Sequence, residues 1–229
     1  MSPAQVKVCC ISSLKEAEMA LKAGATYLGL VSEMPSGPGV ITLDLIHDIV
    51  NGLPGETRTI LLTSKQTAGQ IIRQHKLVKT WGLQLVDKLP EKELLQLRKA
   101  LPKTRLIQVI HVIDKASIKE ALSYANLVDM ILLDSGNPHA KVKTLGGTGN
   151  THDWDTSQEI CRRSSLPVFL AGGLHPGNIQ AAISAVAPVA VDLCSGVRTA
   201  GHLDQDKLTD FMIHFKTDPP KQEAHSNEI

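Results

Sequence analysis

Short apolar runs alternate with longer amphipathic segments along almost the whole chain, and this alternation limits the possible folds more than any other feature. The apolar runs predict strands at residues 6–10, 26–31, 59–63, 83–86, 105–112, 128–134, 167–170 and 189–193. The amphipathic segments predict helices at residues 13–23, 43–52, 66–75, 91–100, 115–125, 156–163, 176–185 and 204–215. Strict alternation is typical of a parallel sheet, because a helix usually carries the chain back between parallel strands.

Eight strand–helix units in 229 residues predict a single (β/α)8 TIM barrel of the α/β class. An open Rossmann-type sheet is the rival architecture, and it is disfavoured because no G-x-G-x-x-G motif follows the first strand. No stretch rich in Gly, Ser or Pro divides the chain, so we expect one barrel domain at residues 1–216. Residues 217–229 are polar and contain two prolines, and we expect a disordered tail there.

Composition argues against several classes of partner. The net charge is +1 and aromatic residues make up 3% of the chain, which does not favour nucleic-acid binding. No apolar run reaches the ~20 residues that span a bilayer, and the N-terminus lacks the pattern of a secretory signal. The four cysteines form no C-x-x-C motif, so a reduced cytoplasmic setting is the simplest interpretation.

Three glycine-rich segments crowd the second half of the chain, and each comes after a predicted strand. Glycine in such loops lets the backbone approach a charged ligand closely, although a glycine pair often marks only a turn. Three of them after strands six, seven and eight are moderately specific for a phosphorylated ligand in a barrel. The candidate phosphate-binding residues are Gly147, Gly149, Gly172, Gly173, Ser195 and Gly196.

Cys9 stands at the end of the first predicted strand, where a barrel places catalytic side chains. A buried, inert cysteine is the plainer interpretation. A general base or nucleophile is the alternative, and Lys7 favours it because residues two apart in a strand share a face and a cation lowers a thiol pKa. We also include Lys7 among the candidate ligand-binding residues. If Cys9 points into the barrel, strand alternation predicts that Cys10 points outward toward the helices.

Two aspartates end other predicted strands. Asp134 closes an apolar run, and it is either a turn carboxylate bonded to the following backbone or a general acid or base at the barrel mouth. A carboxyl that apolar neighbours partly desolvate can hold a proton at neutral pH. Asp192 is either a solvated turn residue or a ligand-binding residue that orients hydroxyls or an amine.

Five motifs together resemble the phosphoribosylanthranilate isomerase family of tryptophan biosynthesis. The family reads K-I-C-G-I-T where this chain has KVCCIS at 7–12, and L-L-D where it has the same letters at 132–134. It reads G-G-T-G-K-x-F-D-W where the chain has GGTGNTHDW at 146–154, and A-G-G-L-x-P-x-N-V where it has AGGLHPGNI at 171–179. It reads V-D-x-S-S-G-V-E where the chain has VDLCSGVR at 191–198.

The resemblance implies an Amadori rearrangement of an N-linked phosphoribosyl amine to a 1-deoxyribulose phosphate. Asp134 would be the general acid that protonates the ribose ring oxygen, and Cys9 would be the general base that takes the proton from C2. It implies no cofactor and no metal. The partner would be a small phosphorylated substrate, bound by a cytoplasmic monomer or homodimer without nucleic acid or membrane.

The chain departs from the family pattern mainly at the aryl end of the ligand site. Gly39 stands where the family has an arginine that grips the anthranilate side, and Val86 stands in place of a histidine. Cys10 replaces a glycine, Asn150 a lysine and Arg198 a glutamate. By loop position, Lys65, His111 and Arg198 are candidates for a replacement cation. A paralogous phosphosugar isomerase with a different substituent and a non-catalytic phosphometabolite-binding protein therefore remain alternatives.

Overall fold

The structure is a computed structural model, and it describes residues 4–135 and 153–217. Eight parallel strands form a closed barrel in chain order, and β1 closes it by pairing with β8. They are β1 (Gln5–Val8), β2 (Tyr27–Val31), β3 (Arg58–Thr63), β4 (Gly82–Leu85), β5 (Arg105–His111), β6 (Met130–Asp134), β7 (Val168–Leu170) and β8 (Ala190–Leu193). The predicted (β/α)8 barrel is confirmed.

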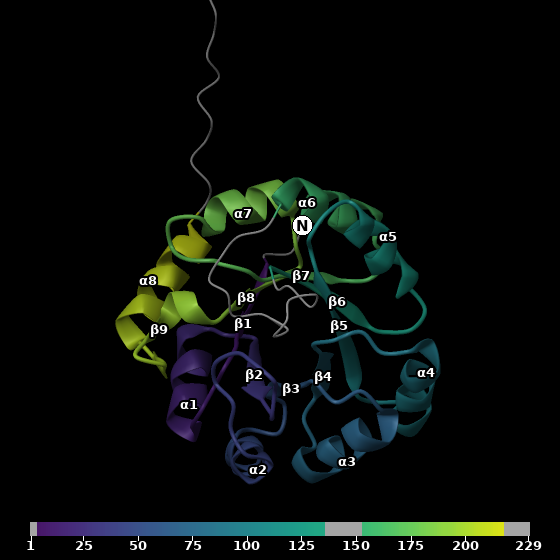
Figure 1. The fold of residues 1–229 in the computed structure, drawn as a ribbon. Helices are drawn as coiled ribbons and strands as arrows, with labels where there is room; N and C mark the ends of the chain where they lie inside the picture. The colour runs from purple at the N-terminus through teal and green to yellow at the C-terminus, as the bar shows by residue number, and fades with distance from the viewer. Residues whose placement is uncertain (1–3, 136–152, 218–229) are drawn as a thin grey trace, which may run out of the picture.

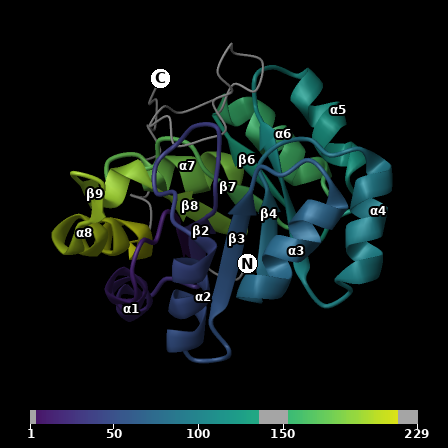
Figure 2. The ribbon, with the colours of Figure 1, turned by 60° about the horizontal axis from the view of Figure 1, so that its bottom comes forward.

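A ring of helices surrounds the strands, as Figure 1 shows. In the described part of the chain they are α1 (Leu14–Ala23), α2 (Leu43–Gly52), α3 (Ala68–Val78), α4 (Glu91–Ala100), α5 (Ala116–Ser123), α6 (Trp154–Arg163), α7 (Ile179–Val186) and α8 (Gln205–Lys216). The tilted view in Figure 2 shows α8 beside α1, where the ring closes. None of the described helices is long and apolar enough to cross a membrane.

Side-chain caps explain where several helices begin. The hydroxyl of Ser13 accepts a hydrogen bond from the Glu16 N–H, and Thr42 and Thr67 cap α2 and α3 in the same way. Asp153 and Asp204 cap α6 and α8 with their carboxylates. These bonds satisfy N–H groups that have no partner within the first helical turn. The predicted helices are all present, and their ends differ from the predicted ones by a few residues.

The segment between β8 and α8 contains elements that the sequence did not suggest. A short 3-10 helix, η1 (Ser195–Val197), follows β8 directly. Two short antiparallel strands come next, β9 (Arg198–Thr199) and β10 (His202–Leu203). The predicted disordered tail at 217–229 lies almost entirely outside the described residues and stays a prediction.

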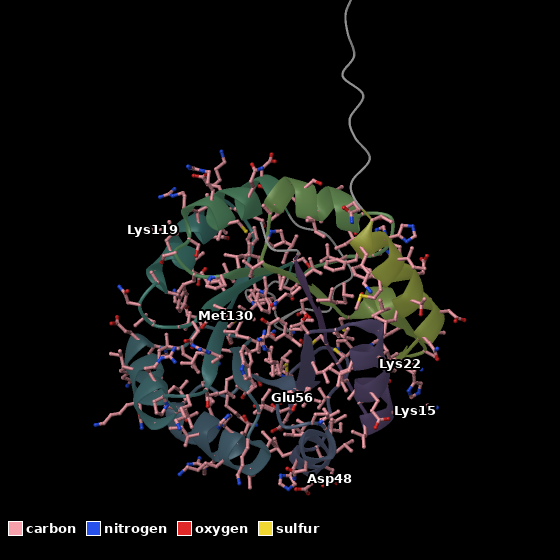
Figure 3. All side chains as sticks on the ribbon, turned by 180° about the vertical axis from the view of Figure 1, so that it is seen from behind. Lys15, Lys22, Asp48, Glu56, Lys119 and Met130 are labelled. Carbon is pink, nitrogen blue, oxygen red and sulfur yellow. The ribbon has the colours of Figure 1, made fainter. Side chains whose placement is uncertain are left out.

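Apolar side chains fill two separate layers. One layer lies between the strands and the helices, and the other lies inside the barrel. The inner layer includes Tyr27, Ile60, Ile107, Leu132 and Phe169, which alternate along their strands with outward-facing residues. Many charged side chains lie on the outside of the molecule. Figure 3 shows Lys15, Lys22 and Lys119 on the outer rim and Met130 within the ring of helices. The packed interior leaves ligand space only at an end of the barrel.

Candidate active site

A cavity lies at the carboxyl ends of the strands and is built from loops that are distant in sequence. The described residues that line it are Cys9, Cys10, Val31, Met34, Ser36, Gly37, Pro38, Leu62, Gln84, Asp134, Ala171, Gly172, Gly173, Leu174, Asp192, Cys194, Ser195 and Gly196. Most of the candidate residues proposed from sequence are in this set. The cavity thus lies at the strand ends where the sequence predicted catalytic side chains.

Cys9 follows the last residue of β1 and lines the cavity while remaining 5% exposed. Its pKa is lowered from 9.0 to about 6. The largest cause is a hydrogen bond from the Cys10 thiol, and the nearby charge of Lys7 lowers it further against the opposing effect of burial. Cys9 is therefore largely a thiolate at neutral pH, as a general base requires.

Lys7 and Asp192 form a buried ion pair beneath Cys9. The two residues face each other in the register of β1 and β8, and Lys7 Nζ donates to Asp192 Oδ2 at 2.7 Å. Although burial opposes its charge, the pKa of Lys7 is raised because Asp192 and Cys9 lie close. Lys7 is fully buried and is not among the described residues that line the cavity, so its position favours an electrostatic role over direct ligand contact.

The second carboxylate oxygen of Asp192 takes no part in the hydrogen bond with Lys7. Asp192 lines the cavity, yet its Oδ1 is buried and has no hydrogen-bond partner among the described residues. A buried acceptor without a partner is costly, so Asp192 Oδ1 is available to accept a hydrogen bond from a donor in the cavity. The interpretation of Asp192 as a solvated turn residue does not fit this burial.

Asp134 is the last residue of β6 and lines the same cavity at 8% exposed. One carboxylate oxygen accepts a hydrogen bond from the Ser135 N–H at 2.7 Å. Both sequence interpretations thus describe part of the geometry, because the carboxyl bonds the following turn and also faces the cavity. The bond holds the carboxyl at the cavity wall.

Two of the three glycine-rich loops lie at the cavity. Gly172 and Gly173 have φ of 88° and 61°, a left-handed backbone that glycine adopts without strain. A Cβ on Gly196 would overlap the carbonyl oxygen of Leu174, so the loops after β7 and β8 are in direct contact there. Ser195 is exposed and begins η1, where helical N–H groups lack carbonyl partners. Gly147 and Gly149 lie outside the described residues, as does Asn150.

Cys10 does not point outward, and that expectation was wrong. Its φ is 63°, so the strand alternation that predicted its direction stops at this residue. The side chain lines the cavity, its Sγ lies 2.9 Å from Cys194 Sγ, and it contacts the Pro38 carbonyl oxygen at 3.6 Å. Strand alternation would direct this side chain toward the helices. Because the backbone at Cys10 is left-handed, the side chain lies in the cavity wall instead.

Gly39 lies directly against Cys10. Its φ is 77°, and a Cβ at this position would come within 2.5 Å of the Cys10 Cβ. The chain therefore has no room for an arginine at position 39 while a side chain stands at position 10. The two departures from the family pattern are sterically linked, which no separate inspection of either motif would suggest.

The three cations suggested as replacements for the arginine do not line the cavity. Arg198 is buried and donates to the carbonyl oxygens of Cys9 and Cys10 and to the Glu16 carboxylate. Lys65 pairs with Glu33 at 2.7 Å, and His111 bonds the Val86 carbonyl oxygen at 3.1 Å. Arg198 therefore fixes the backbone of the β1 loop, and within the described part of the cavity wall there is no Lys, Arg or His.

Two further residues shape the cavity and were missed in the sequence. Gln84 of β4 is 4% exposed, lines the cavity and has an Oε1 without a partner in the described residues. Gly29 lies in the middle of β2, and a Cβ there would come within 2.9 Å of the Cys9 Sγ. Both residues interrupt apolar strands, and this interruption is the sequence signal that could have identified them. Glycine in a strand often marks the close approach of another group.

Among the described residues, no three His, Cys, Asp or Glu side chains converge in an arrangement that could hold a metal ion. The expected absence of cofactor and metal stays a prediction.

Comparison with known proteins agrees with the geometry. A family model described as N-(5'-phosphoribosyl)anthranilate (PRA) isomerase matches residues 6–213. The chain belongs to this family. The predicted relationship and the predicted isomerase class are confirmed, and the PRA isomerase match extends from β1 into α8.

Individual PRA isomerases are similar over nearly their whole length. The N-(5'-phosphoribosyl)anthranilate isomerase of Methanocella arvoryzae is 34% identical over 193 residues, covering 84% of this chain and 88% of the relative. The crystal structure of the Thermotoga maritima enzyme has a TM-score of 0.78 at 28% identity, covering 93% of this chain and 98% of that one. A PRA isomerase in complex with reduced 1-(o-carboxyphenylamino)-1-deoxyribulose 5-phosphate has a TM-score of 0.76 at 26% identity, with the same coverage.

Proposed function

We propose that this chain catalyses the Amadori rearrangement of N-(5'-phosphoribosyl)anthranilate, with Asp134 as general acid and Cys9 as general base. The observation that carries the proposal is that both side chains line one cavity, whose wall continues into the glycine-rich loops after β7 and β8. A substrate with its phosphate at those loops extends its ribose toward Cys9 and Asp134. Family membership supports the same reaction.

The first step opens the sugar ring. Protonated Asp134 gives its proton to the ribose ring oxygen, the bond from that oxygen to C1 breaks, and the amine nitrogen forms a protonated Schiff base with C1. The Ser135 N–H donates to the Asp134 carboxyl and holds it in one orientation. The carboxylate that results takes up a proton again before the next turnover.

The second step moves a proton from carbon. The Cys9 thiolate takes the proton from C2, the electron pair forms the C1–C2 double bond, and the Schiff base becomes an enolamine. Protonation at C1 with loss of the C2 hydroxyl proton then gives the ketone, so substrate and product have the same atoms. The pKa of about 6 keeps Cys9 in the basic form at neutral pH.

The ion pair of Lys7 and Asp192 supports both steps without touching the phosphate. Lys7 stabilises the Cys9 thiolate through its charge. Asp192 Oδ1, which lacks a partner among the described residues, accepts a hydrogen bond from a ribose hydroxyl or from the amine nitrogen. Asp192 thus orients the substrate from the cavity wall, while Lys7 acts on Cys9 from behind that wall.

Phosphate binding is assigned to the backbone of the two described loops. Gly172 and Gly173 after β7, and Ser195 and Gly196 at the start of η1, line the cavity, and we assign the phosphate contacts to their backbone N–H groups. Gly147 and Gly149 are proposed to complete this site from the loop after β6. These assignments, like the predicted monomer or homodimer and the cytoplasmic location, stay predictions.

A second candidate function rests on the aryl end of the cavity. Gly39 leaves no side chain where the family pattern has an arginine, and the described wall of the cavity contains no basic side chain. A bidentate contact between arginine and carboxylate contributes about 1.5–3 kcal/mol. A phosphosugar isomerase with the same acid and base, acting on a substituent without a carboxylate, fits this wall as well.

Complementation of a strain that lacks PRA isomerase separates the two candidates. We expect growth without tryptophan from the full chain, and loss of growth for Cys9→Ser and for Asp134→Asn. Cys161→Ser on α6 and Asp48→Asn on α2 are matched controls outside the cavity, and both should support growth. Soluble, folded protein that does not support growth would contradict the anthranilate assignment and favour the other substituent.

A further inference from the structure

Cys10 and Cys194 bring two thiols together at the edge of the cavity. Their Sγ atoms lie 2.9 Å apart, although the residues are 184 positions apart in sequence. Cys10 stands where the family motif has glycine, and Cys194 stands where it has serine. Two departures from one pattern therefore meet at a single contact. Neither thiol transfers a proton in the proposed acid–base chemistry.

The backbone supports a bond between these sulfurs. Cys10 and Cys194 follow the paired strands β1 and β8, and the Cys9 N–H donates to the Leu193 carbonyl oxygen at 2.7 Å, which holds the two loops together. A disulfide requires an S–S distance of about 2.05 Å, so the sulfurs need to approach by only about 0.9 Å. Both Sγ atoms already point toward one another across the loops.

We propose that Cys10 and Cys194 form a reversible disulfide that lowers the activity of the adjacent site under oxidising conditions. The oxidant is a peroxide. Cys194 is the more accessible thiol, because it is half-buried and Cys10 is 4% exposed. Cys194 therefore attacks the peroxide first, and its sulfur gains a hydroxyl group while one water leaves.

The second step closes the bond. The Cys10 sulfur attacks the sulfenic acid of Cys194, the S–S bond forms, and the hydroxyl group leaves as a second water. Two thiols and one hydrogen peroxide thus give one disulfide and two waters, and a dithiol reductant reverses the change. In a reducing compartment such pairs are transient and respond to oxidants, which suits regulation better than structural stabilisation.

The consequence for the site follows from what Cys10 does in the reduced form. Its thiol donates the hydrogen bond that is the largest cause of the lowered pKa of Cys9. A disulfide sulfur has no proton to donate, so the pKa of Cys9 rises on oxidation. Loss of one hydrogen bond to a charged group shifts a pKa by about one unit or more, which makes the thiolate about tenfold rarer well below pH 6. This effect on activity rests on the proposed function, whereas formation of the bond does not.

Mass spectrometry of the full chain tests the bond directly. The protein is treated with hydrogen peroxide and compared with a reduced sample, and before alkylation we expect a loss of about 2 Da. After unfolding and alkylation without reductant, we expect two alkylated thiols in the oxidised sample and four in the reduced one. Cleavage after Lys and Arg separates residues 8–15 from residues 164–198, and fragmentation between Cys9 and Cys10 assigns the link. Cys161→Ser should form the same link, and Cys194→Ser and Cys10→Gly should not.

The activity of each variant is then measured in its oxidised and its reduced form, and the ratio of the two activities is compared between variants. The wild-type ratio should fall and return after treatment with dithiothreitol, and the fall should be absent in Cys194→Ser. If Cys10→Gly does not fold, Cys194→Ser alone decides the outcome. A Cys9–Cys10 link, oxygen addition at Cys9 without a link, or no mass change would overturn the proposal. A link without any change in activity would keep the bond and reject its effect on the site.

Discussion

The side chain of Cys10 occupies the space beside the α-carbon of Gly39, where a Cβ would lie 2.5 Å from the Cys10 Cβ. Both residues have left-handed backbone, with φ of 63° and 77°. The loop after β2 can therefore lie against the β1 loop only because position 39 has no side chain. A side chain at position 39 therefore requires a change at position 10 as well.

Gly39→Ala tests this contact. We expect the free energy of unfolding to fall by about 1–3 kcal/mol more than for Gly37→Ala, because overpacking adds to the left-handed strain that both variants share. Gly37 is a matched control, since its φ is 108° and the space around it is open. The measurement is urea denaturation of the three proteins.

The double variant Cys10→Gly with Gly39→Ala completes the cycle. Removing the Cys10 side chain should recover most of the stability lost through Gly39→Ala. The coupling energy between the two substitutions should exceed the deviation of about 0.3–0.5 kcal/mol that independent sites show. Additive effects of the two substitutions would show that the contact does not limit position 39.

The rate of the isomerase should depend on the thiolate of Cys9. The pKa of this thiol is lowered from 9.0 to about 6, so the basic form is present above that pH and is lost as the pH falls through it. We expect kcat/KM to decrease tenfold per pH unit below about 6, as measured in a pH–rate profile. The titratable and charged groups near Cys9 are Cys10, Lys7, Arg198 and Asp192.

Cys10→Gly should move this profile. The substitution removes the largest cause of the low pKa, so the acidic limb should shift to higher pH by about one unit. Titration of the thiolate by its ultraviolet absorbance provides an independent reading. An unchanged limb in the variant would mean that Lys7 and not Cys10 sets the pKa of Cys9.

Gly29→Ala should reduce turnover with little effect on substrate binding. The added methyl group meets the Cys9 Sγ and Cα at 2.9 and 3.1 Å, so the base must shift away from the substrate. We expect kcat to fall about tenfold with KM nearly unchanged, since small misplacement of a reacting group costs rate. Gly82→Ala at the start of β4 is the control, and it should change stability without changing kcat.

Arg198→Met should loosen the β1 loop. The guanidinium donates to the carbonyl oxygens of Cys9 and Cys10 and pairs with Glu16, all in buried positions. Its removal leaves a buried carboxylate without its cation, and we expect a loss of about 3–5 kcal/mol in the free energy of unfolding. Arg162→Met removes an exposed ion pair with Glu159 and should cost no more than about 1 kcal/mol. Similar losses in the two variants would contradict the assignment of Arg198 to the loop.

The sequence by itself determined the barrel and the positions of Cys9, Asp134 and the glycine-rich loops after β7 and β8. Strand and helix periodicity, helix caps and glycine turns are local properties, and each is written in a few neighbouring residues. The order of eight alternating units then leaves few ways to close the sheet. Predicted strand ends therefore sufficed to locate the cavity wall, including Asp192 and Ser195.

Only the tertiary structure decided the direction of Cys10 and the partners of Arg198. The alternation of side-chain direction along the strand ends at Cys10, because its backbone is left-handed. No local sequence pattern predicts this φ. The contacts of Cys10 with Cys194 and Gly39 depend on how β1 pairs with β8 and how the loop after β2 folds back. These distances are set by the closure of the whole barrel, so residues far apart in sequence acquire a joint role that neither has alone.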